Sequence, residues 1–393
     1  MKITSVDIYD VQAKWRRSWN PIIIRINTDE GISGLGECGL AVGGGHNAYT
    51  NVVKDFAEAF LIGADPMNGE KIWETIKRRT WWGAGSGIIF ASGISAIDIA
   101  LWDIKGKAAG LPVYHLLGGK TNERIRTYAS QVHSGWPVPP PTPPIAPEEF
   151  ARQALNAVAE GFDAVKVDPI NVDDKGVRAG WDLTKKARND TLKLIYGRVA
   201  AIRKAVGPNV DIILETHAHQ EVTTAIQVGR AMEDLNCLYY EEPVPSLNVD
   251  EMLKVAQNVK IPIAAGEHIY TRWGFRQYFE KQALEVIQPD LCVTGGITEG
   301  KKICDMAHTY GITVQIHCCG SPVTIAAALH VEAVIPNFII HEHISQAQVK
   351  ENLELCTPEI RAVNGYYDIP DRPGLGIELN DKVVNEYPHI KVS

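Results

Sequence analysis

Short β-rich runs alternate with helical stretches throughout the chain after Lys120, and no other feature of the sequence limits the fold as strongly. Amphipathic segments such as EEFARQALNAVAEG and ITEGKKICDMAHTYG separate the β-rich runs. The eight candidate strands, in order, are IRTYAS, FDAVKVD, DIILETH, CLYYEEP, IPIAAGE, LEVIQPD, ITVQIHC and NFIIHEH. This repeated alternation predicts an α/β fold, a (β/α)8 TIM-type barrel over residues 121–355.

The first 120 residues follow a different pattern. The runs ITSVDIYDV, IIIRINT and GLGEC read as antiparallel strands, the last two on either side of a turn at Asp29-Glu30-Gly31. From about residue 45 to 110 the pattern is helical. The tail, residues 356–393, is expected to fold back onto this region. We therefore predict an α+β capping domain formed by residues 1–120 and the C-terminal tail.

Charge and hydropathy restrict the partners of this chain. The net charge is −8 without any Lys/Arg-rich run, so nucleic acid is not an expected partner. No apolar run is long enough to span a bilayer, and no membrane partner is expected. The start, MKITSVDIYD, lacks the apolar region of a signal peptide, and the seven cysteines include no Cys-x-x-Cys pair. These features predict reduced thiols in the cytoplasm.

The last six candidate strands each finish with an ionisable residue, although buried barrel strands are otherwise apolar. These residues are Glu215, Glu241, Glu267, Asp290, His317 and Glu342. They recur at intervals of 23–27 residues, close to the length of one strand–helix unit in such a barrel. Lys166 occupies a similar position in the second strand. The spacing therefore places one functional group at the mouth of each successive strand.

Glu215, Glu241 and Glu267 are predicted to bind one divalent cation per subunit. Three carboxylates a few Å apart repel one another by several kcal/mol, and a hard cation with oxygen ligands removes that repulsion. Mg2+ is the natural choice because it keeps coordination positions open for substrate oxygens, whereas zinc prefers His or Cys. Glu242 is interpreted as a residue that supports the site or pairs with a lysine.

Two histidines are candidates for proton transfer. Asp290 and His317 lie at neighbouring strand ends, and an Asp bonded to a His makes the imidazole a good base. His217 lies two residues beyond Glu215, so on a continuing strand it faces the same cavity and can protonate a leaving group. His219 follows in the predicted loop.

Several segments of the chain resemble the mandelate racemase-like branch of the enolase superfamily, nearest its galactonate dehydratase type. They are IALWDIKGKAAGLPVYHLLGG at 99–119, YYEEP at 239–243, AAGE at 264–267, QPD at 288–290, GGIT at 295–298 and PGLGIE at 373–378. The triplets Glu215-Thr216-His217 and His317-Cys318-Cys319, and Glu342 at the eighth strand, also match that type. The resemblance covers nearly the whole chain.

The resemblance implies a Mg2+-dependent carbon–oxygen lyase acting on a sugar acid, an aldonate or an aldarate. Mg2+ would bind the substrate carboxylate, and His317, oriented by Asp290, would remove the C2 proton. Lys166 and Glu342 would stabilise the enediolate. Glu342 helps only if it is protonated or shares a strong hydrogen bond, so a raised pKa is predicted for it. His217 would protonate the departing C3 hydroxyl, giving a 2-keto-3-deoxy acid. A homo-oligomer, dimer or octamer, is also implied.

Two positions depart from that branch. Its first metal ligand is usually Asp, where this chain has Glu215. Racemases of the branch carry Lys-x-Lys at the second strand, where this chain has Lys166-Val167-Asp168. Without a second lysine the site lacks the second base that racemisation needs. This favours dehydration with one base, His317, and one acid, His217. The alternatives are an epimerase, racemase or cycloisomerase on a similar carboxylate, a metal-dependent hydrolase using the His-x-His at 217–219, or a non-catalytic relative.

Substrate selection is assigned to loops of the capping domain. Trp15 and Arg16 lie in the segment 14–19, and His46 follows three glycines, where that branch closes over its ligand. Arg16 and Arg17 would meet a second carboxylate at the far end of a dicarboxylic sugar acid, and a solvated basic turn is the alternative. Asp168 and His219 are further substrate-binding candidates. Insertions at 135–147 and 171–189 are predicted at the same face, either as functional loops or as linkers.

Overall fold

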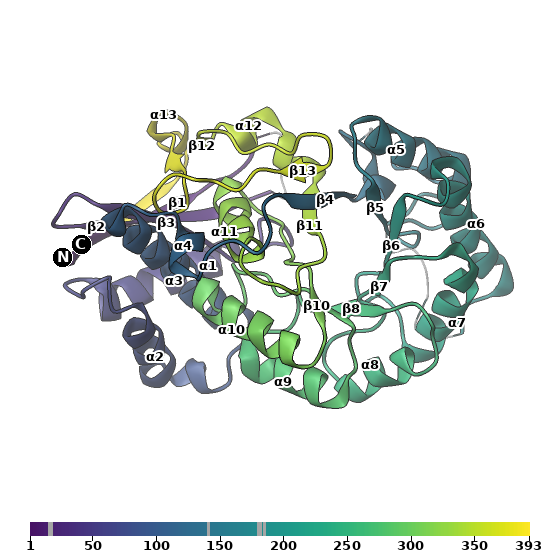
Figure 1. Cartoon of the computed structure of the whole chain (residues 1–393), viewed down its shortest axis with the longest axis horizontal. Helices are drawn as coiled ribbons and strands as arrows, with labels where there is room; N and C mark the ends of the chain where they lie inside the picture. Colours follow the sequence, from purple (N-terminus) through teal and green to yellow (C-terminus); the bar gives the residue numbers. More distant parts are fainter. Residues whose placement is uncertain (15–18, 140–141, 179–182, 184–185) are drawn as a thin grey trace.

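The computed structural model describes residues 1–14, 19–139, 142–178, 183 and 186–393. Its capping domain contains a four-stranded antiparallel sheet in the order β15-β1-β2-β3. The strands are β1 (Ile3–Asp10), β2 (Ile22–Thr28), β3 (Ser33–Cys38) and β15 (His389–Val392). Because β15 is the last element of the chain, the tail completes the sheet of the N-terminal region, and the two termini lie close together (Figure 1).

Three helices share a buried apolar core with this sheet: α1 (His46–Phe56), α2 (Gly69–Arg79) and α3 (Ile88–Ala109). The short helix α4 (Val113–Leu116) follows α3. Helix α3 packs directly on β3, where Gly34 and Gly36 permit the close approach. A Cβ at Gly36 would lie 1.9 Å from the carbonyl oxygen of Ala96. The glycines of GLGEC therefore fix the sheet-to-helix packing of the capping domain.

The barrel consists of eight parallel strands in chain order, each at one of the eight predicted positions. They are β4 (Ile125–Ser130), β5 (Ala164–Val167), β6 (Asp211–Glu215), β7 (Tyr239–Glu241), β8 (Ile263–Ala265), β9 (Val286–Ile287), β10 (Thr313–Val314) and β11 (His341–Ile344). Strand β11 pairs with β4, and Val314 exchanges backbone hydrogen bonds with Asn337 and Ile339, which closes the ring. The predicted fold class is confirmed.

An outer layer of helices follows the strands around the barrel (Figure 1). They are α5 (Pro147–Ala159), α6 (Asn189–Val206), α7 (Val222–Met232), α8 (Val249–Ala256), α9 (Thr271–Lys281), α10 (Gly296–Thr309) and α11 (Pro322–Glu332). The interior is filled by one cluster of buried side chains, among them Tyr128, Ile213 and Tyr239. The centre of the barrel is thus a packed core, and the reactive groups collect above it.

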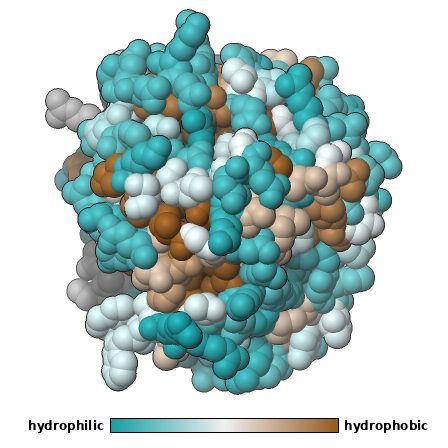
Figure 2. Space-filling view, turned by 90° about the vertical axis from the view of Figure 1, so that its left-hand side faces the viewer, coloured by the Kyte–Doolittle hydropathy of each residue, from teal (hydrophilic) through white to brown (hydrophobic). Residues whose placement is uncertain are grey.

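The tail runs through short elements before it reaches the cap. They are α12 (Lys350–Leu353), β12 (Cys356–Thr357), β13 (Tyr366–Tyr367), β14 (Glu378–Leu379) and α13 (Asp381–Val384). On the cap side of the molecule, apolar residues form separate patches among hydrophilic ones (Figure 2). In the described part of the chain, no helix combines the length and apolar character that crossing a membrane requires.

Candidate active site

A buried ammonium group lies among three carboxylates at the mouth of the barrel. The Nζ atom of Lys166 on β5 is 2.7 Å from Glu241 Oε1, 2.8 Å from Glu342 Oε1 and 3.5 Å from Glu215 Oε2. Parallel pairing produces this cluster, because Glu215 and Glu241 are register partners at the ends of β6 and β7. The structure therefore brings together four residues that the sequence placed at separate strand ends.

The charge of Glu342 differs from the expected one. Burial raises the pKa of Glu342, but Lys166 and His317 lower it to about 2. The hydroxyl of Ser130 donates to its Oε1 at 2.7 Å, and the backbone N–H of Cys318 donates to its Oε2 at 3.2 Å. The predicted rise in the pKa of Glu342 is wrong, because donors from three other strands or loops stabilise the carboxylate form.

Glu215 and Glu241 carry oxygens suited to a cation. Glu215 Oε1 accepts the backbone N–H groups of Thr216 at 2.8 Å and His217 at 2.6 Å. Its Oε2 lies 3.5 Å from the Lys166 ammonium, and neither this oxygen nor the buried Oε2 of Glu241 has a hydrogen-bond partner among the described residues. Burial raises the pKa of Glu215 to about 7 and that of Glu241 well above its ordinary value. Buried carboxylate oxygens without donors are costly, and a hard cation is the group that fits them.

Glu267, the third predicted ligand, lies toward the other side of the mouth. Its Oε2 is 3.2 Å from His317 Nε2, and its Oε1 is 4.0 Å from His268 Nδ1. Ligand atoms of Glu242, Glu267 and His268 also converge, within 4.8 Å of one another. Donor chemistry favours the predicted set over this one, because His268 Nδ1 and Glu242 Oε2 already bond each other at 2.7 Å.

His317 and Asp290 form a buried pair at the ends of β10 and β9. The His317 Nδ1 atom lies 2.8 Å from Asp290 Oδ2, and the two residues form an isolated parallel bridge. Burial lowers the pKa of His317, whereas Glu267, Glu342 and Asp290 raise it well above its ordinary value. With Nδ1 held by the aspartate, Nε2 is the nitrogen that faces the carboxylates of the site.

A second His–Asp pair lies beside β5 and β6. His217 Nδ1 is 2.7 Å from Asp168 Oδ2, while Asp168 Oδ1 accepts the N–H of Ile170 at 2.8 Å. Strand β6 ends at Glu215, and His217 has a positive φ of 44°, so a continuing strand does not orient it as the sequence argument assumed. Asp168 has one oxygen bonded to His217 and the other to the backbone N–H of Ile170, and its expected contact with substrate stays a prediction.

The remaining predicted substrate contacts belong to neither pair, and two of them lie outside the described residues. His219 is exposed, with its ring 6.3 Å from that of His217. His46 is half-buried and begins α1. Trp15 and Arg16 lie outside the described residues. Their expected roles in substrate binding stay predictions.

Glu37 and His133 were not singled out from the sequence, although both lie beside the site. Glu37 is a buried carboxylate of the capping domain that accepts hydrogen bonds from Ser321 and Thr324 at the start of α11. His133 is a buried imidazole next to Asp168. A glutamate within the apolar run GLGEC was the one available signal for Glu37.

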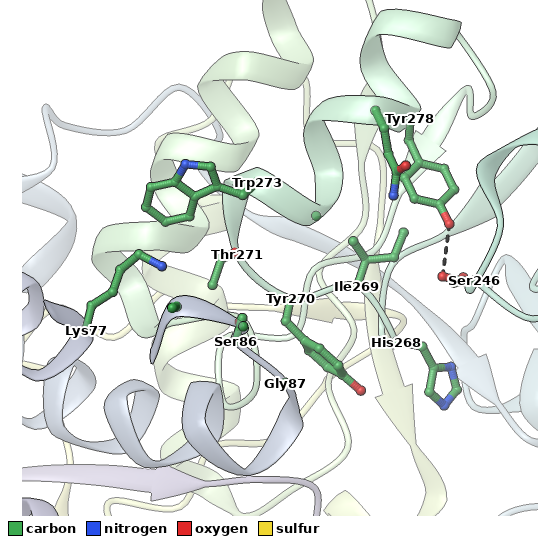
Figure 3. A pocket seen from close by; sticks show the side chains of 14 residues that line it. Lys77, Ser86, Gly87, Ser246, His268, Ile269, Tyr270, Thr271, Trp273 and Tyr278 are labelled. Atoms are coloured by element: carbon green, nitrogen blue, oxygen red, sulfur yellow. Dashed lines mark hydrogen bonds between the residues drawn. The ribbon is translucent and has the colours of Figure 1, made fainter. Parts of the chain in front are cut away.

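A cavity of about 630 Å³ extends from His268 between the capping domain and α9. In Figure 3, His268 lies at one end of the cavity near Tyr270, and Lys77 lies at the other end near Trp273. The Lys77 ammonium is 4.1 Å from the centre of the Trp273 ring. The hydroxyl of Tyr278 donates to the carbonyl of Ser246 at 3.1 Å and closes one wall.

A capped parallel barrel with carboxylates, a lysine and two His–Asp pairs at the carboxyl ends of its strands defines an enzyme of the enolase kind. Residues 12–118 match the model of the mandelate racemase/muconate lactonizing enzyme N-terminal domain, and residues 149–383 match the enolase C-terminal domain-like model. The chain belongs to the enolase superfamily, in its mandelate racemase and muconate lactonizing enzyme branch.

Relatives match over almost the whole chain. The D-galactonate dehydratase of Variovorax paradoxus is 32% identical over 387 residues, which are 97% of this chain and 93% of the relative. That of Ralstonia nicotianae is 33% identical over 391 residues, or 98% and 94% of the two chains. A solved enolase superfamily member from Salmonella Typhimurium is 52% identical with a TM-score of 0.97, covering 100% of both chains. The relatives agree with the prediction of a carbon–oxygen lyase.

Proposed function

We propose that this enzyme dehydrates a sugar acid, an aldonate or aldarate, to a 2-keto-3-deoxy acid in a Mg2+-dependent reaction. The observation that carries the proposal is the pair of His–Asp dyads, His317–Asp290 and His217–Asp168, beside one cluster of carboxylates. Dehydration needs one group that removes a proton and another that delivers one. Relatives named D-galactonate dehydratase support the same reaction class.

Glu215, Glu241 and Glu267 are the residues proposed to hold Mg2+. When bound there, the cation supplies Lewis-acid stabilisation of negative charge on the substrate carboxylate. The buried Oε2 atoms of Glu215 and Glu241 support this assignment. The longer side chain of Glu215, in place of the Asp usual in the branch, is accommodated because its Oε1 is anchored by two backbone N–H groups.

His317 is proposed to remove the C2 proton at Nε2, while Asp290 fixes the Nδ1–H tautomer. Loss of that proton places a second negative charge near the carboxylate, and the ammonium of Lys166 is the group of this chain that stabilises it. One preorganised donor of this kind is typically worth about 3–4 kcal/mol. Glu342, being ionised, holds Lys166 in position instead of donating a proton itself.

His217 is proposed to protonate the C3 hydroxyl as it leaves. Asp168 holds Nδ1, so the proton is delivered from Nε2. Burial lowers the pKa of His217 and Asp168 raises it, and the net pKa lies above the ordinary value. The imidazolium form that a general acid requires is therefore favoured. The enol left by dehydration then becomes the 2-keto-3-deoxy acid.

Epimerisation is the second candidate, and one observation favours it. The missing second lysine of Lys-x-Lys argued against a two-base reaction, yet Asp168 at that position gives His217 a carboxylate partner of its own. His217 is thereby equipped to act as a base as well as an acid. A dimeric or octameric assembly and a cytoplasmic location also remain proposals.

The two candidates are separated by incubating the enzyme with aldonic and aldaric acids and Mg2+ in D2O. Dehydration is expected to release 2-keto acid from at least one substrate. The His217→Asn variant should lose that product while deuterium still enters C2, and His317→Asn should lose both. Deuterium entry with inversion at C2, and no 2-keto acid from any substrate, would establish the epimerase instead.

A further inference from the structure

His133 lies where the two members of the second dyad meet. It belongs to the 3-10 turn Val132–Ser134, directly after β4, and Gln131 before it adopts a left-handed conformation with a φ of 66°. The imidazole lies next to Asp168, the first residue after β5. The side chain is 3% exposed. His133 is therefore held inside the barrel mouth and is not part of the outer loop surface.

The imidazole accepts a hydrogen bond from the backbone of Asp168. The Asp168 N–H donates to His133 Nδ1 at 2.9 Å. Because a backbone amide can only donate, Nδ1 carries no proton and Nε2 is the protonated nitrogen. Burial lowers the pKa of His133 to about 3, so the ring stays neutral under working conditions. It offers an acceptor to Asp168 without placing a cation beside the aspartate.

The same ring also contacts His217. The two ring centroids are 6.2 Å apart with an interplanar angle of 76°, an edge-to-face arrangement. His133 thus touches the backbone of Asp168 and the ring of His217. The carboxylate of Asp168 connects the two through its 2.7 Å bond to His217 Nδ1.

Asp168 needs such support because of its place in the chain. Strand β5 ends at Val167, so Asp168 is the first residue beyond it, and its N–H bonds to His133 instead of a neighbouring strand. A shift in this backbone moves the carboxylate and, with it, Nε2 of His217. A displacement of about 1 Å at a reacting group can cost a factor of about 100 in rate.

We propose that His133 is a positioning residue for the proton-donating dyad, one that fixes the Asp168 backbone and the His217 ring so that the C3 hydroxyl is protonated. The assignment rests on the proposed dehydration. It predicts a specific defect: without His133 the C2 proton is still removed, but the enediolate is protonated again before the hydroxyl leaves.

The test compares His133→Leu, His133→Asn and His133→Gln with wild type, using a dehydrated sugar acid in D2O with Mg2+. The side-chain oxygen of Asn can take the place of Nδ1 as an acceptor, whereas Gln reaches the position of Nε2. We expect the ratio of C2 deuteration to 2-keto acid formation to rise about 100-fold in the Leu and Gln variants. Asn should restore most of the wild-type ratio, with KM little changed.

Two results would overturn the role of His133: an equal loss of deuteration and dehydration in the Leu variant, or the same ratio in the Asn and Gln variants. If Leu does not fold, the Asn–Gln comparison decides alone. When wild type makes 2-keto acid and the ratios stay constant, only the role of His133 fails. When wild type neither dehydrates nor deuterates any acid, the proposed function fails.

Discussion

Glu37 of the capping domain holds Ser321 of the barrel through two hydrogen bonds, from the hydroxyl at 2.7 Å and from the backbone N–H at 3.0 Å. Ser321 is the N-cap of α11, four residues after His317. The chain after Glu37 continues the contact, because Gly39 N–H donates to the carbonyl of Cys292, two residues beyond Asp290. The capping domain therefore fixes both loops that carry the proposed base and its partner.

Replacing Glu37 with Ala should destabilise the enzyme and slow the reaction. The substitution leaves the buried N–H groups of Ser321 and Thr324 without their acceptor, at about 1–3 kcal/mol for each unpaired group. We expect a lower melting temperature and a lower kcat. Glu58→Ala, which removes an exposed carboxylate of the same domain, is the control and should change stability by about 0.5 kcal/mol or less. Equal melting temperatures for the two variants would contradict the assigned contact.

Glu37 should also make stability depend on pH. Burial raises its pKa in the folded enzyme to about 7, from an ordinary value of 4.5. The folded state then holds the proton more tightly, so this contribution to stability is present at low pH and is lost as pH rises from 4.5 to 7. Each pH unit costs up to about 1.4 kcal/mol. Melting curves of wild type and Glu37→Gln at pH 5 and pH 7.5 check this. Wild type should lose stability relative to the variant as pH rises, and parallel curves would refute the shift.

The fold could be read from the sequence because buried parallel strands are short apolar runs with polar ends. Glu215, Glu241 and Glu342 ended those runs. Strand register pairs Glu215 with Glu241, and all three carboxylates lie around the Lys166 ammonium. The pairing of His217 with Asp168 could not be read, because two successive residues of positive φ, His217 and Ala218, turn the chain after β6. The alternation of side chains along a strand predicts which residues share a face, but it does not predict the direction of side chains in the turn after the strand.

Contacts between segments far apart in the chain could not be predicted from the sequence either. Glu37 and Ser321 are 284 positions apart. The charge of Glu342 depends on Ser130 and Lys166, which come from other strands, so a glutamate expected to be protonated is ionised in the fold. The positions of strand ends predict which groups face the barrel mouth. They do not predict whether each group is protonated.

The protonation of Glu342 leads to a prediction that separates its two possible roles. If Glu342 is an ionised anchor for Lys166, Glu342→Gln removes the charge and should lower kcat, by about 100-fold if it displaces the ammonium by about 1 Å. Glu342→Asp keeps the charge and should retain more activity than Gln. If Glu342 instead donated a proton or hydrogen bond, Gln, which still has N–H groups, would be the better substitute. Steady-state kinetics of both variants with one dehydrated acid decide between the roles.

Metal binding is predicted to stabilise the enzyme through Glu241 and not through His268. A cation that binds only the folded state adds about 2.7 kcal/mol at a concentration of 100 Kd, so Mg2+ should raise the melting temperature of wild type and EDTA should reverse the rise. Glu241→Gln should abolish the rise, because it removes one of the two buried oxygens that lack a donor among the described residues. His268→Asn alters the alternative group formed with Glu242 and Glu267 and should leave the rise intact. The reverse result, a rise kept by Glu241→Gln and lost by His268→Asn, would move the ion to that alternative group and away from the carboxylates that surround Lys166.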